Sequence, residues 1–132
     1  MKIRIYYEDT DAGGIVYHAN YIKFCERARS EMFFSSGLDF DEKRSFVVVN
    51  INANFIKPAV LGDLLEVRSQ VVQIKKASVT LRQEIYKIGR LSEACEPKLI
   101  FSCDVVLAFL NRSKVAKIDE ETVKIFKTNE KF

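Results

Sequence analysis

The sequence lacks a long apolar run. Its longest uninterrupted apolar stretch is Val105–Leu110, far below the ~20 residues that a membrane-spanning helix needs. Met1–Tyr7 alternates polar and apolar residues and is followed at once by acidic side chains, unlike the apolar segment of a signal peptide. We therefore expect a cytoplasmic protein with no transmembrane segment.

The sequence also lacks a dense block of basic residues. Lys and Arg number 21 against 18 Asp and Glu, a net charge of +3, and the two signs alternate along the chain. Domains that bind nucleic acid concentrate basic residues in a patch or stripe. This distribution argues against a nucleic-acid partner and remains compatible with a small anionic ligand.

Cysteine is sparse. Cys25, Cys95 and Cys103 are odd in number and include no C-x-x-C pair, so neither a zinc site nor a redox motif is indicated. We expect reduced thiols in a cytosolic protein and no metal or redox cofactor.

No internal repeat, low-complexity tract or linker divides the chain. With 132 residues, 48% of them hydrophobic and 30% charged, it matches the size and composition of one globular domain spanning residues 1–132. A core without disulfide or metal is feasible at this size. Enclosing a large substrate within one such chain is difficult.

The periodicity changes from strand to helix and back to strand along the chain. Ile3, Ile5 and Tyr7 alternate with polar residues and predict a first strand. Helical spacing then runs from about Tyr17 to Ser35, with Gly37 suited to a C-terminal cap. Its predicted inward stripe comprises His18, Tyr21, Ile22, Cys25, Ala28 and Met32.

Four β-like runs follow the helix. In the first, Val47, Val49, Ile51, Ala53 and Phe55 are expected to share one face. Runs over 64–74, 78–88 and 98–110 come next, then a short helix from Asp119 to about Lys127 and a fraying tail over 128–132. The pattern predicts an α+β fold, a five-stranded antiparallel sheet wrapped around one long central helix.

The segment Tyr7–Tyr21 carries the chemistry of this sequence. Three carboxylates, two glycines and the only histidine lie between a strand end and a helix start. The first N–H groups of a helix lack intrahelical partners and can polarise a carbonyl oxygen. Asp11 precedes His18 by seven residues, and Gly13-Gly14 can fold it back toward the helix start as a base or nucleophile.

Tyr6–Tyr21, continued by Glu26–Glu31, closely resembles the active-site motif of hotdog-fold acyl-CoA thioesterases of the 4-hydroxybenzoyl-CoA thioesterase type. The segment is closer still to their YbgC-like branch, whose genes accompany the Tol-Pal system. Lys57-Pro58-Ala59 and Gly62-Asp63 also resemble this family. The stretch from Gly89 to Pro97 departs from it, because a tight hairpin needs fewer residues.

The resemblance implies roles for individual residues. Asp11 corresponds to the catalytic carboxylate, which attacks the thioester to give a mixed anhydride or activates water; without the motif it would be a turn or capping residue. The oxyanion donor is a main-chain N–H at about His18, with Tyr17 close by. The His18 side chain is either packed or catalytic, and Tyr7 either fills the core or brings its hydroxyl to the loop.

Other polar residues near the motif favour structural roles. Glu8 and Asp9 are expected to be solvated or in a turn, with a raised Asp11 pKa as the alternative. Glu26 is expected to pair with Arg29 or Arg27. Cys25 falls in the apolar stripe, which argues against a nucleophile.

The resemblance also implies the ligand and its partners. The acyl group is expected between the helix and a neighbouring subunit's sheet, against Ile22, Val47 and Val49, in a homodimer or homotetramer. No residue is assigned to the coenzyme A phosphates, for which the basic candidates are Lys57, Lys75, Lys76, Lys87 and Arg90.

The expected activity is hydrolysis of short-chain, aromatic or longer acyl-CoA, with acyl carrier protein conjugates as further substrates. The alternative is a non-catalytic protein that binds acyl-CoA or acyl carrier protein as a scaffold at a membrane-associated complex. The Tol-Pal association would place either form at the periphery of the inner membrane. Nucleic acid binding, which only the pI of about 8.7 suggests, ranks last.

Overall fold

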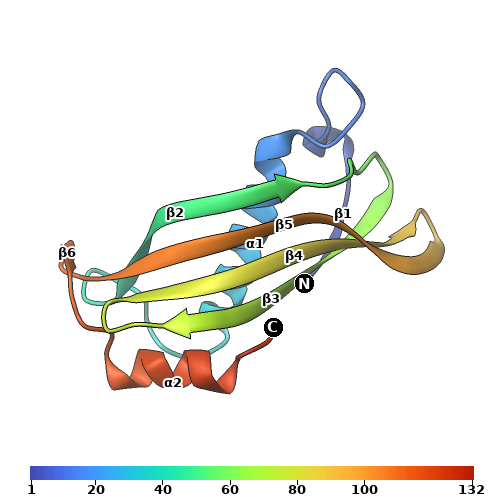
Figure 1. The fold of residues 1–132 in the computed structure, drawn as a ribbon. Helices are drawn as coiled ribbons and strands as arrows, with labels where there is room; N and C mark the ends of the chain where they lie inside the picture. Colours follow the sequence, from blue (N-terminus) through green and yellow to red (C-terminus); the bar gives the residue numbers. More distant parts are fainter.

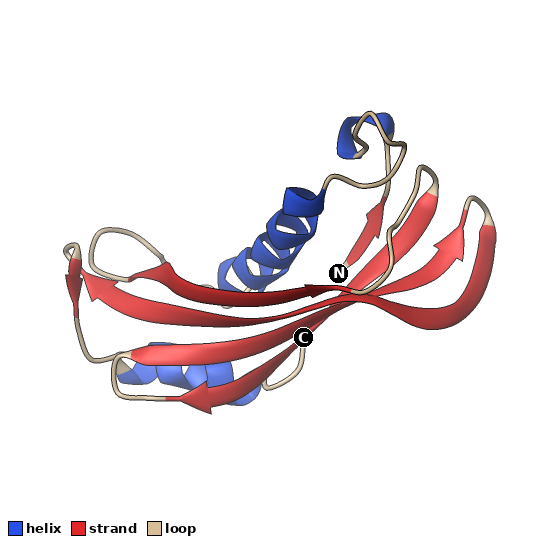
Figure 2. Ribbon diagram, turned by 45° about the horizontal axis from the view of Figure 1, so that its top comes forward, coloured by secondary structure: helices blue, strands red, loops and turns tan.

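One antiparallel sheet, in the order β1-β3-β4-β5-β2, carries the long helix α1 on one face (Figures 1 and 2). The computed structural model describes all residues, 1–132. This confirms the expected α+β architecture, to which the structure adds a short strand pairing with β5. The elements are β1 (Lys2–Arg4), the 3-10 helix η1 (Tyr7–Asp9), α1 (His18–Phe34), β2 (Ser45–Phe55), β3 (Asp63–Ile74), β4 (Ser78–Arg90), β5 (Glu93–Asn111), β6 (Lys114–Val115) and α2 (Glu120–Thr128).

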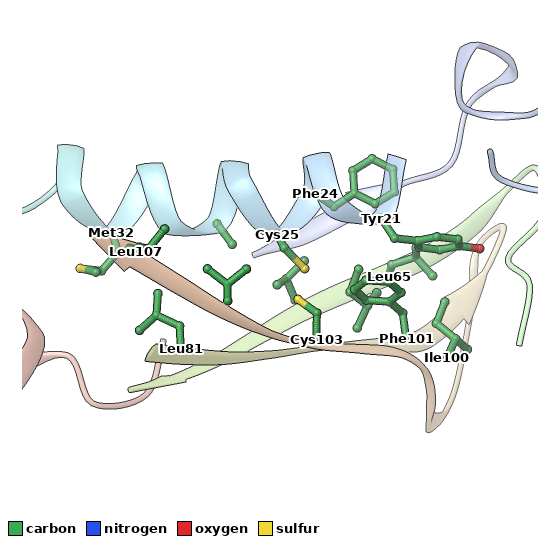
Figure 3. Packing of buried hydrophobic residues seen from close by; sticks show 14 of the residues in the cluster. Tyr21, Phe24, Cys25, Met32, Leu65, Leu81, Ile100, Phe101, Cys103 and Leu107 are labelled. Carbon is green, nitrogen blue, oxygen red and sulfur yellow. The ribbon is translucent and has the colours of Figure 1, made fainter. Parts of the chain in front are cut away.

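Helix α1 packs through a stripe of mostly apolar side chains against the sheet, as Figure 3 shows. Phe101 of β5 lies beneath it with no exposed surface, its ring stacked at 5.4 Å on Tyr21 and edge-on at 5.2 Å to Phe55. The predicted stripe is correct except at its start, since His18 is exposed and Ile22 half-buried. The first turn of α1 extends from an exposed loop, which explains the difference.

A bulge in β2 changes which residues face the helix. Val48 pairs with Leu107, but Asn50 pairs with Val106, so Val49 is an extra residue in the ladder. Residues paired across an antiparallel sheet point to the same face. Val48 therefore shares the helix-facing side with Ile51, and the expectation that Val47 and Val49 share that face is wrong.

The connection between β4 and β5 is a two-residue turn, so the extra length of Gly89–Pro97 lies in the paired strands and not in the turn. Arg90 pairs with Glu93 across Leu91-Ser92, with Leu91 at φ +53°. A Cβ on Gly89 would meet the Glu93 carbonyl oxygen at 2.8 Å, which requires glycine there. Pro97 lies where β5 is bulged against β4, and proline within a strand obscured the pattern.

Both chain ends lie along the edge of β3. Strand β1 ends at Arg4, so the expectation that Tyr7 belongs to this strand is wrong. The residues after α2 do not fray, because the N–H groups of Ser69 and Val71 donate to the carbonyls of Phe132 and Glu130 at 2.6 and 2.8 Å. β1 and the C-terminal residues thus cover this sheet edge, whereas β2 forms the opposite edge.

Neither α1 nor α2 combines the length and the apolar character that a membrane-spanning helix needs.

Asp119 caps α2 by accepting the Thr122 N–H at 2.8 Å, and it pairs with Arg44 at 3.2 Å. Burial alone would raise the pKa of Asp119, but the hydrogen bonds from Thr122 and Arg44 outweigh burial and lower it. We predict that Asp119→Ala lowers the free energy of unfolding by about 0.5–2 kcal/mol near neutral pH, the range measured for lost N-caps.

The difference between wild type and Asp119→Ala should shrink with acid. A pKa lowered by folding gives stability that is complete above the unfolded value of ~3.9 and is lost as the pH falls through the folded value. Urea unfolding at neutral pH and below about pH 4 measures the difference. A difference that grows in acid would contradict the assignment.

Candidate active site

The loop between η1 and α1 closes on itself before the helix begins. Thr10 and Val16 form an antiparallel bridge, and the Tyr17 N–H donates to the Asp9 carbonyl at 3.0 Å. Asp11 lies inside the closed loop, directly after Thr10, and His18 follows the closure as the first residue of α1. The closed loop therefore lies at the N-terminal end of α1.

The Asp11 carboxylate is exposed and held by its own turn. Its Oδ1 accepts the Gly13 N–H at 2.8 Å, and the Asp11 N–H donates to Ile15 at 2.9 Å. Gly14 takes φ +80°, which favours glycine in this turn. The turn uses one hydrogen bond to the carboxylate and leaves the group accessible to a ligand.

The start of α1 presents main-chain N–H groups without acceptors. Those of His18 and Ala19 donate to no group of the chain, and they carry the positive end of the helix dipole. The Tyr17 N–H is occupied by Asp9. Of the two expected oxyanion donors, Tyr17 is therefore unavailable in this arrangement and His18 remains a candidate.

Two expected side-chain candidates are exposed. The His18 ring lies 4.6 Å from that of Tyr17 and 6.1 Å from that of Phe55, and its nitrogens have no hydrogen-bond partner. Tyr7 lies in η1 and is 81% exposed. Of the two alternatives for Tyr7, packing in the core is therefore wrong, because β1 ends before this residue.

The turn after β2 supports the loop. Ile15 bridges Val60, the Val16 N–H donates to the Ala59 carbonyl at 2.9 Å, and the Ala59 N–H donates to the Tyr21 hydroxyl at 2.9 Å. The two segments that carry the family resemblance thus meet in space. They stabilise one another through main-chain contacts.

Two residues of this site, Asn20 and Tyr21, were missed as functional candidates, and Asp9 was considered only for its side chain. The Asp9 carbonyl accepts from both Tyr17 and the Asn20 amide, so Asp9 and Asn20 together orient the helix start. Tyr21 is buried, and burial raises its pKa; the hydrogen bond from the Ala59 N–H opposes this, and the nearby charges of Asp63 and Asp11 add to it. Helical periodicity assigned Tyr21 to the core, and no sequence signal indicated that its hydroxyl faces the loop.

The basic candidates lie in different places. Lys87 and Arg90 are 3.2 and 3.3 Å from the buried carboxylate of Asp63, which they neutralise. Lys75 and Lys76 lie at the turn between β3 and β4, at the other end of the sheet. Lys57 directly precedes the turn that supports the loop and has no acidic partner, whereas Arg90 reaches the same turn through the Leu61 carbonyl at 2.9 Å.

A cavity of about 290 Å³ opens between α1 and β2. Phe33, Phe34, Phe46 and Val48 supply much of its apolar lining, and Glu26 and Arg29 lie along it. The expected ion pair of Glu26 with an arginine is wrong. Glu26 accepts from the Ser30 hydroxyl at 2.7 Å, while Arg29 turns inward to the Gln83 side chain at 2.9 Å.

No group of three or more His, Cys, Asp or Glu side chains is placed to hold a metal ion. The chemistry available is that of an exposed carboxylate in the loop that leads into a helix start with free N–H groups. Such a pair can polarise a carbonyl oxygen and deliver a nucleophile or base to its carbon.

The chain is similar in sequence to known thioesterases. The family model of the thioesterase superfamily matches residues 13–94. The chain is 48% identical over 120 residues to an acyl-CoA thioesterase YbgC of Helicobacter pylori, covering 89% of this chain and 90% of that protein. It is 42% identical over 87 residues to an acyl-CoA thioester hydrolase YbgC of Escherichia coli O6:H1, covering 63% and 65%.

A solved structure confirms the fold. A 4-hydroxybenzoyl-CoA thioesterase mutant, crystallised with 4-hydroxybenzoyl-CoA, superposes with a TM-score of 0.82 at 20% identity over 95% of each chain. The family match and the close relative together settle the assignment. The chain belongs to the thioesterase superfamily and has its hotdog fold.

Proposed function

We propose that this protein hydrolyses acyl-CoA thioesters, with Asp11 as the reacting carboxylate and the start of α1 as the electrophilic group. One observation carries the proposal: the closed loop holds an exposed carboxylate and two acceptor-free N–H groups at one helix end. The N–H groups of His18 and Ala19 would donate hydrogen bonds to the thioester carbonyl oxygen as negative charge develops on it.

Two routes lead from this arrangement to products. Asp11 either attacks the carbonyl carbon, expelling the coenzyme A thiolate and leaving a mixed anhydride for water to cleave, or removes a proton from water that attacks directly. A single turnover in isotopically labelled water tests the first route. Label in the Asp11 carboxylate would require the anhydride.

The acyl group would run along α1 from the site to the cavity. Ile22 lies one turn after His18, and Glu26, which lines the cavity, one turn after Ile22, on one helix face. Eight residues separate His18 from Glu26, about 12 Å along the axis. Because of the bulge, Val48 and not Val47 or Val49 is proposed to line this path.

Lys57 is the proposed cation for a coenzyme A phosphate. It is exposed and adjoins the loop, whereas Lys87 and Arg90 already neutralise Asp63.

A second copy would pair along β2. This edge strand exposes Val47, Val48, Val49 and Phe55, and a long apolar edge is a template for pairing with another chain. The other sheet edge is covered by β1 and the C-terminal residues. A homodimer, or a homotetramer built from two dimers, would bring a second subunit beside the cavity.

Ala53→Pro tests this edge. The Ile56 N–H donates inward to the Ile100 carbonyl, so by alternation the N–H of Ala53 points outward. Proline there removes an outward donor and keeps the pairing with β5. We expect the dimer dissociation constant to rise at least about tenfold, ~1.4 kcal/mol, measured by analytical ultracentrifugation.

Ala53→Ser is the matched control, since serine keeps the N–H, and it should associate like the wild type. An Ala53→Pro protein that dimerises as tightly as the wild type would exclude β2 as the interface.

A cytoplasmic location is part of the proposal, and the three free cysteines support a reducing compartment. A position at the periphery of the inner membrane remains the alternative location. Carrier-protein-bound acyl groups are the further substrates to test, because the free N–H groups would contact only the thioester.

Release of free thiol from short-chain, aromatic and long-chain acyl-CoA tests the activity. Hydrolysis of at least one class is expected. Saturable binding of acyl-CoA without thiol release from any of them would instead indicate the non-catalytic scaffold.

A further inference from the structure

Two thiols face one another in the core and have no part in the proposed hydrolysis. Cys25 of α1 and Cys103 of β5 are both buried and free. Figure 3 shows the two sulfurs pointing toward one another between helix and sheet. The contact joins residues 78 positions apart in the sequence.

A buried cation lies beside this pair. Arg29 follows Cys25 by one helical turn, is only 6% exposed, and donates to the Gln83 side chain at 2.9 Å. No carboxylate lies within 4 Å of its guanidinium. Gln83 is also the residue of β4 that pairs with Cys103. A buried positive charge without an acidic partner favours a negative charge nearby.

The surroundings distinguish the two sulfurs. The neighbouring Cys25 thiol, and after it the Arg29 charge and the Gln83 main chain, lower the pKa of Cys103 against burial and the Asp104 charge. The neighbouring Cys103 thiol and burial raise the pKa of Cys25. Cys103 is therefore the better nucleophile and Cys25 the resolving thiol.

We propose that Cys25 and Cys103 form a peroxide-sensitive dithiol that closes to a reversible disulfide between α1 and β5. The Cys103 thiolate attacks one oxygen of hydrogen peroxide, the O–O bond breaks, and hydroxide leaves, giving a sulfenic acid. The Cys25 sulfur then attacks the Cys103 sulfur and expels the hydroxyl oxygen as water. Overall, two thiols and one peroxide yield one disulfide and two waters.

The bond would tie the helix to the sheet. A disulfide holds its sulfurs ~2.05 Å apart and its Cα atoms within ~6.8 Å, so α1 would be held against β5 two turns after His18. The proposal does not depend on hydrolysis, since it concerns side chains outside the loop.

The test uses the folded protein carrying Cys95→Ser, which leaves only the two core thiols. After hydrogen peroxide and alkylation of residual thiols, peptide mass spectrometry should find Cys25 linked to Cys103, with a mass lower by two hydrogen atoms. Dithiothreitol should restore both thiols.

Two further variants in the same background separate the roles. Cys25→Ser should stop at the sulfenic acid of Cys103, captured by dimedone, and Cys103→Ser should leave Cys25 unmodified at the same peroxide concentration. Both thiols remaining reduced until the protein is unfolded in urea would overturn the proposal. Dimedone capture at Cys25 instead of Cys103 would overturn the assigned order.

Discussion

Asp11→Asn will lower the rate of acyl-CoA hydrolysis by about 10²–10⁴-fold, the range that one acid–base group contributes. The amide has the size of the carboxylate, and its oxygen can still accept the Gly13 N–H at the position of Oδ1. The turn should therefore persist, and the loss would report chemistry and not a rearranged loop. Thiol release under saturating acyl-CoA measures the effect.

Glu8→Gln is the matched control. Glu8 is an exposed carboxylate in the same segment and its side chain has no hydrogen-bond partner, so its removal should leave the rate within about twofold of the wild type, as for an exposed residue outside the chemistry. If Asp11→Asn retained the full rate while Glu8→Gln lost it, the assignment of the reacting carboxylate would be wrong.

Phe101→Ala should have the largest effect on stability. Its ring has no exposed surface and packs between Tyr21 and Phe55. Truncating a buried phenylalanine removes transfer free energy and leaves a cavity, at a cost of about 3–5 kcal/mol. Urea unfolding should show this loss in the midpoint, with the slope unchanged.

Val115→Ala provides the comparison, since Val115 is 67% exposed in β6, and a change within about 0.5 kcal/mol is expected. Phe101→Leu, which fills part of the space, should fall between the two. A loss below about 1 kcal/mol for Phe101→Ala would show that the core collapses around the missing ring.

Periodicity was sufficient for α1 and for the central strands, because their buried faces extend over many residues. Burial of Tyr21, Cys25, Ala28 and Met32 follows directly from their helical spacing. Periodicity was insufficient at β2, because the extra residue Val49 reverses the face of the sheet to which each earlier residue of the strand points. Three consecutive valines at Val47–Val49 give no signal for which of them is the extra residue.

The candidate site also has one part that could be predicted from the sequence and one part that could not. Asp11, the glycines and the helix start are consecutive in sequence, so their proximity could be predicted from local structure. The occupation of the Tyr17 N–H by Asp9 depends on how the loop closes. The hydroxyl of Tyr21 at Ala59 and the neutralisation of Asp63 by Lys87 and Arg90 depend on how elements distant in sequence meet. None of these contacts follows from spacing along the chain.

The sequence by itself determined the absence of long apolar runs and basic blocks, the order of helix and strands, and the loop that carries the reacting carboxylate. Each of these depends on neighbouring residues and their periodicity. Only the tertiary structure decided which N–H groups stay free, which edge of the sheet is open, and which thiols meet. The free N–H groups depend on how the loop closes, and the open edge and the facing thiols depend on residues distant in sequence, whose register is set by packing and by bulges.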